Sequence, residues 1–399
     1  MKKWASIAGI VVLCLALVIG VACGGGGGEE EEGGVKEVKF GFGGPLSGLS
    51  GALIGLPAKQ GIELAAETIG EFTVAGERYR WKVIVEDNMW TSAGGVATAT
   101  KLIYEDGVKI MHQSGGDAGM SAQAICEGAG VLLDISGGGI TALGLDRPHT
   151  FQTSPTYIMH TPVLFQWLTT AHPEVKRVAA VNADDQTGHM VADAFVESAE
   201  YFGLEVVANE FVPSGTSEFY PTGTKVLATD PELVEIYPGT GWPELKELGY
   251  EGLGTHVLWG TAAGDTAGWD NVQGFLIYQP NPFGEMSQEL EDFCAVFEDR
   301  YGTELTMGPL YAATIVYIFT EAMQKAGTVD DVEKIADVLE AETFDTWVGP
   351  IKYGGEGLVG IGHVALWPAY VAEISDHDYN VIYEMSAEEA EALAIEVFK

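Results

Sequence analysis

The sequence has 399 residues, in which 58 Asp and Glu side chains outnumber 20 Lys and Arg side chains and give a net charge of -38. Phosphate binding needs a basic face, so nucleic acid and acidic membrane surfaces are poor partners, and we expect no nucleic-acid partner. A chain of this length is able to bury a large core, and its length indicates two or three domains.

The first residues have the features of a targeting segment. Lys2 and Lys3 precede a nearly unbroken apolar run at residues 7–21, which is typical of a secretory signal peptide, here residues 1–22. The junction that ends in Cys23 resembles a bacterial lipobox, which implies that Cys23 is lipidated and attaches the mature protein to the membrane. Residues 23–34 would then form a flexible Gly/Glu tether. The alternative is an uncleaved anchor, because the apolar run is close to membrane-spanning length.

Cysteine and histidine usage gives no indication of a metal or a cofactor. Of the four cysteines, Cys14 lies in the signal segment and Cys23 at its end, which leaves Cys126 and Cys294. These two could pair in an oxidising compartment, but their spacing does not require it. The sequence has no CxxC motif and no Cys/His cluster, so we expect neither a metal site nor a cofactor.

From residue 35 the chain alternates between short apolar runs and amphipathic segments. Strands are expected at residues 38–42 and 81–85 and in runs that begin at Ile110 and Val131, and helices at residues 62–69 and from Thr91 or Ser92 to Tyr104. The last two runs end in Ser/Gly loops, whose glycines let backbone N–H groups approach a bound molecule. Two such turns side by side predict one wall of a ligand cleft.

After residue 151 the same alternation restarts. Strands are expected at residues 178–181, 205–207, 233–237, 257–259, 274–278, 351–353, 362–366 and 379–383, and helices at residues 190–202, 287–301, 309–326, 329–339 and 386–397, the last opening with a Ser386 cap. Repeated strand–helix units predict an α/β fold, in which helices cover both faces of parallel sheets. Two such series predict two lobes.

Motifs of enzymes are mostly missing from the sequence. After the first expected strand, Gly41-Phe42-Gly43-Gly44-Pro45-Leu46 fails as a dinucleotide fingerprint at its third glycine, and a proline stands where the helix should begin. The sequence has no Walker A, GxSxG or HExxH motif. Adjacent acids at residues 184–185 are typical of a solvated loop. We therefore expect no catalytic residues and no enzyme.

Several short segments carry a resemblance to a known family. In the first half of the chain they are the loop after the first strand (residues 43–48), the following helix (60–65), the end of the second strand (85–88) and a first crossing between lobes (151–155). Further along they are a turn (185–188), a late helix (311–327) and a last crossing (349–353). In order and spacing they resemble the branched-chain amino acid-binding (Leu/Ile/Val-binding) proteins of ABC transporters, which are type I periplasmic binding proteins. The resemblance spans residues 38–366.

The resemblance implies a two-lobed type I periplasmic binding protein fold, in which each lobe is a parallel sheet flanked by helices and three hinge crossings join the lobes. Lobe 1 would comprise residues 35–153 and 280–348, and lobe 2 residues 154–279 and 349–399. A ligand would be clamped between the lobes by a hinge motion. Clefts at the carboxyl ends of α/β strands are preferred binding places, which agrees with this expectation.

Ligand contacts are expected from loops 44–51, 114–120 and 136–141 in lobe 1 and from loops 185–188, 239–243 and 260–264 in lobe 2. The candidate ligand-binding residues in or near these loops are Ser47, Trp90, Gly116, Asp117, Ala118, Ser136, Gly137, Gly138, Thr187, Trp242 and Thr261. Each tryptophan could stack on a planar or apolar ligand or pack in the core. His112 and Gln113, at the end of a strand, are expected to be buried and hydrogen-bonded.

Asp117 bears most directly on the ligand. The resemblance implies a Ser/Thr-rich third loop for an α-carboxylate and an acid in lobe 2 for an ammonium group. Asp117 would repel a carboxylate unless it is protonated or turned away, and the stretch around Thr261 has no acid. We therefore expect an amide, amine or hydroxyl on the ligand rather than a simple zwitterion. The alternative is that Asp117 caps a helix.

These observations predict an extracytoplasmic, lipid-anchored solute-binding protein. It would capture a small polar or amphipathic molecule (an amino acid, amide or related compound) and deliver it to an ABC permease in the membrane. A second hypothesis with the same fold is a ligand-sensing module for a membrane receptor. A third is an enzyme that uses the cleft, against which the lack of a nucleophile–base pair argues.

Overall fold

The computed structural model describes residues 34–399, apart from residues 138, 238, 257–263, 265–266 and 279–285. Cys23, with the expected signal peptide and most of the tether, lies outside the described residues. Val35–Lys399 forms one compact unit. Within the described ranges no helix has the length and apolarity to cross a membrane.

The first sheet has six strands in the order β2-β3-β1-β4-β5-β6. Their bounds are β1 Lys36–Gly44, β2 Glu71–Val74, β3 Glu77–Asp87, β4 Ile110–Ser114, β5 Leu132–Ser136 and β6 Thr150–Phe151. All neighbours pair in parallel except β2 and β3, which form an antiparallel hairpin. Strand β2 is not among the strands expected from the sequence, because four residues are too few to show a clear periodicity.

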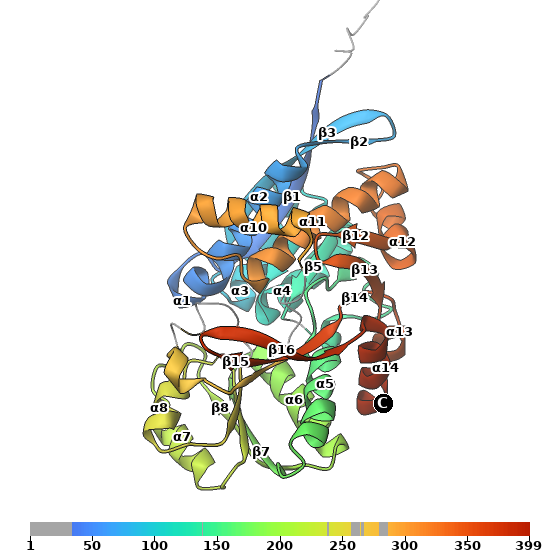
Figure 1. Cartoon of the computed structure of the whole chain (residues 1–399). Coiled ribbons are helices and arrows are strands. Elements are labelled where there is room, and N and C mark those ends of the chain that lie inside the picture. The colour runs from blue at the N-terminus through green and yellow to red at the C-terminus, as the bar shows by residue number, and fades with distance from the viewer. Residues whose placement is uncertain (1–33, 138, 238, 257–263, 265–266, 279–285) are drawn as a thin grey trace, which may run out of the picture. The chain divides into compact units, whose positions relative to one another are not determined.

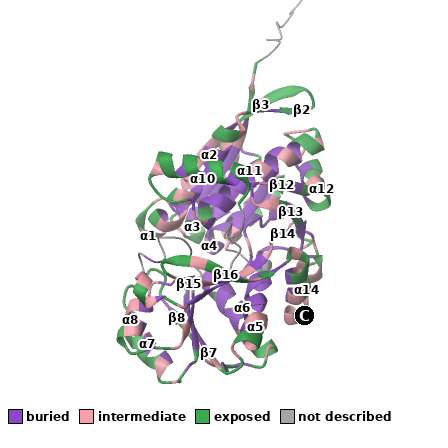
Figure 2. Cartoon of the chain, in the orientation of Figure 1, coloured by how far each residue is buried: buried purple, intermediate pink, exposed green. Residues whose placement is uncertain are grey.

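Helices from two distant stretches of the chain belong to this sheet (Figure 1). They are α1 Gly48–Ser50, α2 Leu56–Ile69, α3 Ser92–Tyr104, α4 Gly116–Ala129, α10 Gln288–Tyr301, α11 Met307–Ala326 and α12 Val332–Ala341, with a π-turn at Gly51–Gly55 and a 3-10 turn at Ile140–Ala142. The Thr91 cap is confirmed, since its Oγ1 accepts the Gly94 N–H at 3.0 Å. Core strands and inner helix faces are buried (Figure 2).

The second sheet has seven strands in the order β16-β15-β11-β10-β9-β7-β8. The strands are β7 Arg177–Ala183, β8 Glu205–Val212, β9 Leu233–Ile236, β10 Leu253–His256, β11 Leu276–Ile277, β15 Ala369–Ser375 and β16 Asp378–Met385. Strands β7 to β11 are parallel, whereas β15 pairs antiparallel with β11 and β16. The strand expected at residues 257–259 lies outside the described residues.

The helical segments that follow or cover these strands include the expected C-terminal helix. They are α5 Tyr157–Ala171, α6 Gln186–Tyr201, α7 Tyr220–Leu227, α8 Trp242–Glu247, the 3-10 turn Trp269–Asn271, α13 Glu356–Val359 and α14 Ala387–Phe398. Ser386 caps α14 through a capping box with Glu389, which confirms the cap expected there.

The chain passes three times between the two sheets. The first passage runs from β6 to α5, the second from β11 to α10 and includes residues 279–285, and the third runs from β14 (Val364–Leu366) to β15. The resemblance places the last crossing at residues 349–353, but these residues belong to β13 (Gly349–Gly354), which pairs with β12 (Thr343–Thr346) and β14 in a three-stranded sheet. The lobe boundaries expected from the sequence stay a prediction.

The first and third passages are tied to each other. Gln152 forms a parallel bridge with Val364, and the Trp367 indole N–H donates to the Thr153 carbonyl at 2.7 Å. Both contacts are buried, so the two connecting segments act as one joint rather than as independent linkers.

The two cysteines of the folded unit are free thiols in the part of the chain that the structure describes. Burial raises the pKa of Cys126 to about 12 and that of Cys294 to about 11. Both groups therefore stay protonated at neutral pH, where the thiolate is the reactive form.

Gly61 determines how closely α2 approaches α11. A Cβ atom on Gly61 would lie 2.1 Å from the carbonyl oxygen of Pro309, in the first turn of α11. This separation is far below van der Waals contact, so a side chain there forces the two backbones apart. The contact fixes the N-terminus of α11, which lines the cavity described below.

We expect Gly61→Ala to lower the free energy of unfolding by about 1–3 kcal/mol, because the added methyl group overpacks the contact between α2 and α11. The matched control is Gly128→Ala in α4, where an added Cβ meets open space. This control should be neutral or raise stability by about 0.4–1 kcal/mol. Urea unfolding measures both changes, and equal stabilities of the two variants would contradict the packing argument.

A buried carboxyl group lies in the second sheet. Glu235 on β9 is fully buried, and its Oε2 accepts the Tyr278 hydroxyl at 2.6 Å. Burial raises the pKa of Glu235 to about 8, because a carboxylate loses its hydration there. The folded protein therefore keeps this group protonated at pH values where the unfolded chain has already ionised it.

Stability should fall as the pH rises from the usual carboxyl pKa of 4.5 to about 8, because the folded state binds one proton more than the unfolded chain across this window. The slope from this group approaches about 1.4 kcal/mol per pH unit. Glu235→Gln removes this contribution. The difference in unfolding free energy between the wild-type protein and Glu235→Gln should therefore change between pH 4.5 and about 8 and level off above pH 8. A difference that is constant with pH would disprove the raised pKa of Glu235.

Candidate ligand-binding site

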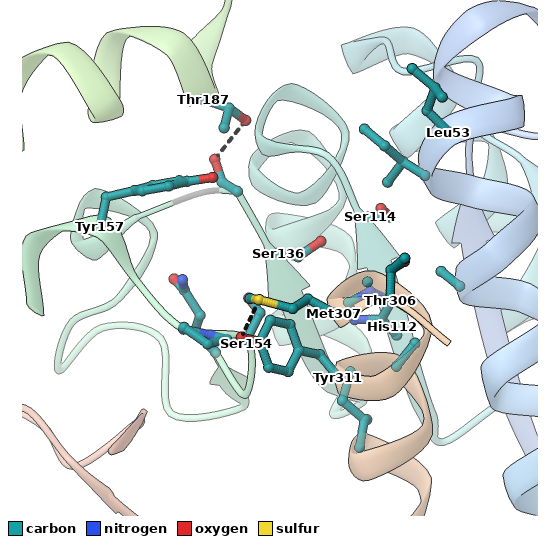
Figure 3. A pocket seen from close by; sticks show the side chains of 18 of the residues that line it. Leu53, His112, Ser114, Ser136, Ser154, Tyr157, Thr187, Thr306, Met307 and Tyr311 are labelled. Atoms are coloured by element: carbon teal, nitrogen blue, oxygen red, sulfur yellow. Dashed lines mark hydrogen bonds between the residues drawn. The ribbon is translucent and has the colours of Figure 1, made fainter. Parts of the chain in front are cut away.

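A cavity of about 190 Å³ lies between elements of the two sheets, where parallel strands end (Figure 3). The first sheet contributes residues that follow β3, the ends of β4 and β5, and the start of α11. The second contributes residues of α5, α6 and the end of β9. The lining includes Leu53, Ile54, Trp90, His112, Ser114, Ser136, Gly137, Gln152, Ser154, Tyr157, Thr187, Met190, Tyr237, Thr306, Met307, Gly308 and Tyr311.

Trp90 is held at the cavity by a buried asparagine. The Asn88 side-chain amide donates to the carbonyls of Gly43 and Ser114, at 3.1 and 2.8 Å, and its Oδ1 accepts the Trp90 N–H at 2.9 Å. Trp90 has a φ of 57°, a left-handed conformation that is uncommon outside glycine. Its indole packs on Gly115, where a Cβ would approach the ring to 3.1 Å. The hydrogen bond to Asn88 and the packing on Gly115 thus hold Trp90 in a strained backbone conformation that places its ring at the cavity.

His112 forms part of a buried network. Its Nδ1 lies 2.7 Å from Oδ2 of the fully buried Asp134. The other oxygen of Asp134 accepts the Thr153 N–H at 2.8 Å and the Thr153 hydroxyl at 2.5 Å, and the Tyr353 hydroxyl lies 2.6 Å from Thr153 Oγ1. The expectation that His112 is buried and hydrogen-bonded is confirmed. The network connects the cavity wall to the first passage between the sheets.

Two hydrogen bonds join α6, on the second sheet, to elements of the first. The Gln186 N–H donates to Oδ2 of Asp117 at 3.3 Å, and the Thr187 hydroxyl donates to the Gly137 carbonyl at 3.0 Å. Asp117 stands in the first turn of α4, so its carboxylate also faces the partial positive charge at the start of α6. Asp117 therefore links two helices rather than lining the cavity.

The structure brings together four of the residues singled out from the sequence: Trp90, Ser136, Gly137 and Thr187 line the cavity. Their contact with a ligand stays a prediction. Gly138 and Thr261 lie outside the described residues.

The remaining candidates are placed elsewhere. The Ser47 hydroxyl donates to Asp87 Oδ2 at 2.9 Å, Ala118 is fully buried, and a Cβ on Gly116 would lie 2.4 Å from the Gly137 carbonyl oxygen. Trp242 is fully buried, with its ring centroid 4.4 Å from that of Phe275. Its packing matches the core alternative that the sequence left open.

Sequence reasoning missed the contribution of α11. Thr306, Met307, Gly308 and Tyr311 line the cavity, although they lie about half the chain away from the glycine loops. The only signal for them was the threonine just before an expected helix, which is compatible with an N-cap at any surface position. Gln152 and Ser154 lie in the recognised crossing segment, but nothing in that pattern shows that they face a ligand.

The cavity has a mainly apolar lining with a few polar groups and little charge. Among the described residues no Asp, Glu, Lys or Arg side chain lines it. Gln152 Oε1 and Ser154 Oγ are buried and have no hydrogen-bond partner within the described structure. Buried polar atoms are normally paired, so these two lack the hydrogen-bond partners that such atoms usually have. Asp185 lines a smaller adjoining cavity, but its oxygens already accept the Gly188 N–H and the Ser214 hydroxyl.

The double variant Asp117→Ala/Thr187→Val should open the ligand-free protein. It removes two bonds worth about 0.5–1.5 kcal/mol each, which shifts a balance between open and closed forms by about ten-fold or more. Small-angle X-ray scattering should report a larger radius of gyration. Thr100→Val, on the exposed face of α3, is the control and should leave the radius unchanged. Identical radii for both variants would show that these bonds do not hold the closed form.

The chain belongs to the periplasmic binding protein family, whose sequence model matches residues 37–378. A leucine-, isoleucine-, valine-, threonine- and alanine-binding protein of Pseudomonas aeruginosa is 25% identical over 295 residues, which cover 69% of this chain and 74% of that protein. A leucine binding protein, LivK, of Thermotoga maritima has 17% identity and a TM-score of 0.76, with 88% of this chain and 99% of that chain covered. A solute binding protein of an ABC transporter from R. palustris, in complex with benzoate, has 16% identity and a TM-score of 0.77, with 88% and 96% covered.

These similarities confirm the family and the fold class expected from the sequence. Two sheets that are mainly parallel and flanked by helices match type I periplasmic binding proteins. The family is one of solute-binding proteins and not of enzymes, and membership implies an extracytoplasmic location.

Proposed function

We propose that this protein captures a small solute in the cavity between its two sheets and delivers it to an ABC permease. The observation that carries the proposal is a cavity of about 190 Å³ that both sheets line. A molecule in that cavity contacts elements of both sheets at once and stabilises the closed arrangement. A permease that distinguishes closed from open forms then receives only loaded protein.

The lining supports a small amphipathic solute, such as an amino acid, an amide or a related compound. Leu53, Ile54 and Met190 offer apolar surface, while Ser136 and Gln152 offer a hydroxyl and an amide. The Pseudomonas relative is named for aliphatic amino acids, and the R. palustris structure holds benzoate. Both kinds of molecule combine a carboxylate with a compact apolar body, which suits this lining.

The N-terminal segment supports attachment to the outer face of a membrane. In this proposal residues 1–22 are removed, Cys23 is lipidated, and residues 23–34 tether the folded unit near its permease. Residues 35–153 with 280–348, and 154–279 with 349–399, form the two lobes that close on the solute.

A thermal-shift screen of residues 35–399, the compact unit, tests the proposal. The panel contains aliphatic and aromatic amino acids, their amides, polyamines, aromatic and aliphatic carboxylates and diols. A ligand at about 100 times its dissociation constant adds about 2.7 kcal/mol and raises the melting temperature by a few degrees.

Mass spectrometry after incubation should recover each hit chemically unchanged. Conversion of a hit would indicate an enzyme instead of a carrier. A panel without any hit would remove the support for solute capture.

A further inference from the structure

We propose that the cavity selects a small monocarboxylate that has no charged amine, and that it holds the carboxylate by the first turn of α11 together with His112. This inference rests on the proposed function, because it concerns the same cavity. It reverses the expectation that the sequence raised about Asp117, whose carboxylate is bonded to α6 and does not line the cavity.

The first turn of α11 offers uncapped donors. Thr306 is the N-cap residue of this 20-residue helix, but its side chain forms no capping hydrogen bond with the first N–H groups of the helix. Met307 and Gly308 line the cavity, Pro309 has no N–H, and the Leu310 N–H already donates to the Thr306 carbonyl. The N–H groups of Met307 and Gly308 therefore remain for a bound anion, and the helix adds a partial positive charge.

The charge environment of this helix start favours an external anion. Its first turn contains no acidic residue in the described structure. Acidic side chains normally offset the partial positive charge of a helix N-terminus, and they are abundant in this chain, which has 58 of them. Their absence at a turn that faces a cavity leaves the positive end of a long helix for the ligand.

His112 is the second element of the site. Its Nδ1 is bonded to Asp134, so the ring is fixed in orientation and Nε2 is the nitrogen left for the cavity that the ring lines (Figure 3). No hydrogen bond from the rest of the described chain engages Nε2. In an ion pair of His112 with Asp134 both ring nitrogens carry a proton, so that Nδ1–H donates to Asp134 and Nε2–H donates to the ligand. Both oxygens of Asp134 are already engaged within the protein, one by His112 and the other by Thr153.

A buried hydroxyl without a hydrogen-bond partner supports a polar ligand group. Ser154 lines the cavity and is 9% exposed, and its Oγ has no partner among the described residues. A hydroxyl donates to a carboxylate oxygen as readily as it accepts a hydrogen bond. Together with two backbone N–H groups and His112 Nε2, it completes a set of donors.

The same lining offers nothing to a charged amine. With no Asp or Glu among the described lining residues, a buried ammonium would lose its hydration without gaining a counter-charge. The amino group is therefore the feature that separates accepted from rejected ligands, and the apolar body is held by Trp90, Leu53 and Met190.

Isothermal titration of the full-length chain in detergent tests the inference with matched probes. They are 4-methylpentanoate, leucine, 4-methylpentanamide, benzoate, benzamide and choline. We expect the two carboxylates to bind, and leucine and the two amides to bind at least ten-fold more weakly than the carboxylate of the same body. Leucine or an amide that binds as tightly as its carboxylate, or tight binding of choline alone, would overturn the inference and leave solute capture standing. Binding by none of the probes would overturn the inference, while a hit elsewhere in the wider panel would keep the proposed function.

Gly308 permits a test against a matched control. Gly308→Pro removes the backbone N–H at a first-turn position where proline is tolerated, and should weaken carboxylates about ten-fold while hardly changing the amides. The control is Glu388→Pro, at the same first-turn position of α14 and exposed to solvent, which should keep the affinity for carboxylates. Equal affinities of the two variants would contradict the role of α11.

His112→Gln provides a second test that does not depend on α11. It should lower the affinity for carboxylates at least ten-fold relative to amides, whereas His172→Gln, at the exposed end of α5, should not. Melting temperatures of all four variants separate lost folding from lost binding. An unchanged ratio of carboxylate to amide affinity in a folded His112→Gln protein would exclude His112 from the site.

Discussion

The Asp134 carboxylate is the interaction on which the rest of this structure depends. It is fully buried, yet it accepts hydrogen bonds from His112 on one side and from Thr153 on the other. A buried carboxylate is costly unless it is paired in this way, so neither partner is free to leave. Thr153 belongs to the first passage between the sheets and His112 to the cavity wall. One buried carboxyl group thus couples the geometry of the joint to the geometry of the site.

The cavity exists because the ends of many elements meet there. Parallel strands direct their carboxyl ends to one edge, and the helices that follow or cover them begin at the same edge. Strand ends supply hydroxyl and imidazole side chains, and helix starts supply N–H groups. The bonds of Asp117 and Thr187 to partners across the cavity add a few kcal/mol at most, since each is worth about 0.5–1.5 kcal/mol. That scale is compatible with the opening and closing that the proposed function requires.

The acidity of the chain and the composition of its cavity are separate features. With a net charge of -38, the surface repels anions at long range. At physiological ionic strength that field is screened within about 8 Å, so it does not decide what binds in an enclosed space. Local donors decide, and in the described lining these include backbone N–H groups, hydroxyls, the Gln152 amide, the Trp90 indole and one imidazole. A carboxylate ligand is therefore compatible with a strongly acidic protein.

The sequence by itself determined the elements and their class. The alternation of apolar runs with helical segments, the glycine turns and the caps at Thr91 and Ser386 are local signals, because they depend on residues only a few positions apart. Short strands such as β2 were not predicted, since pairing partners rather than local pattern define them. The tertiary structure alone decided what faces the ligand. Gly61 lets α2 pack closely on the start of α11, and Met307 and Gly308 line the same cavity as His112. Asp117 is bonded to α6 and is not part of this lining. Such contacts join segments that lie far apart in the sequence, so no local pattern encodes them.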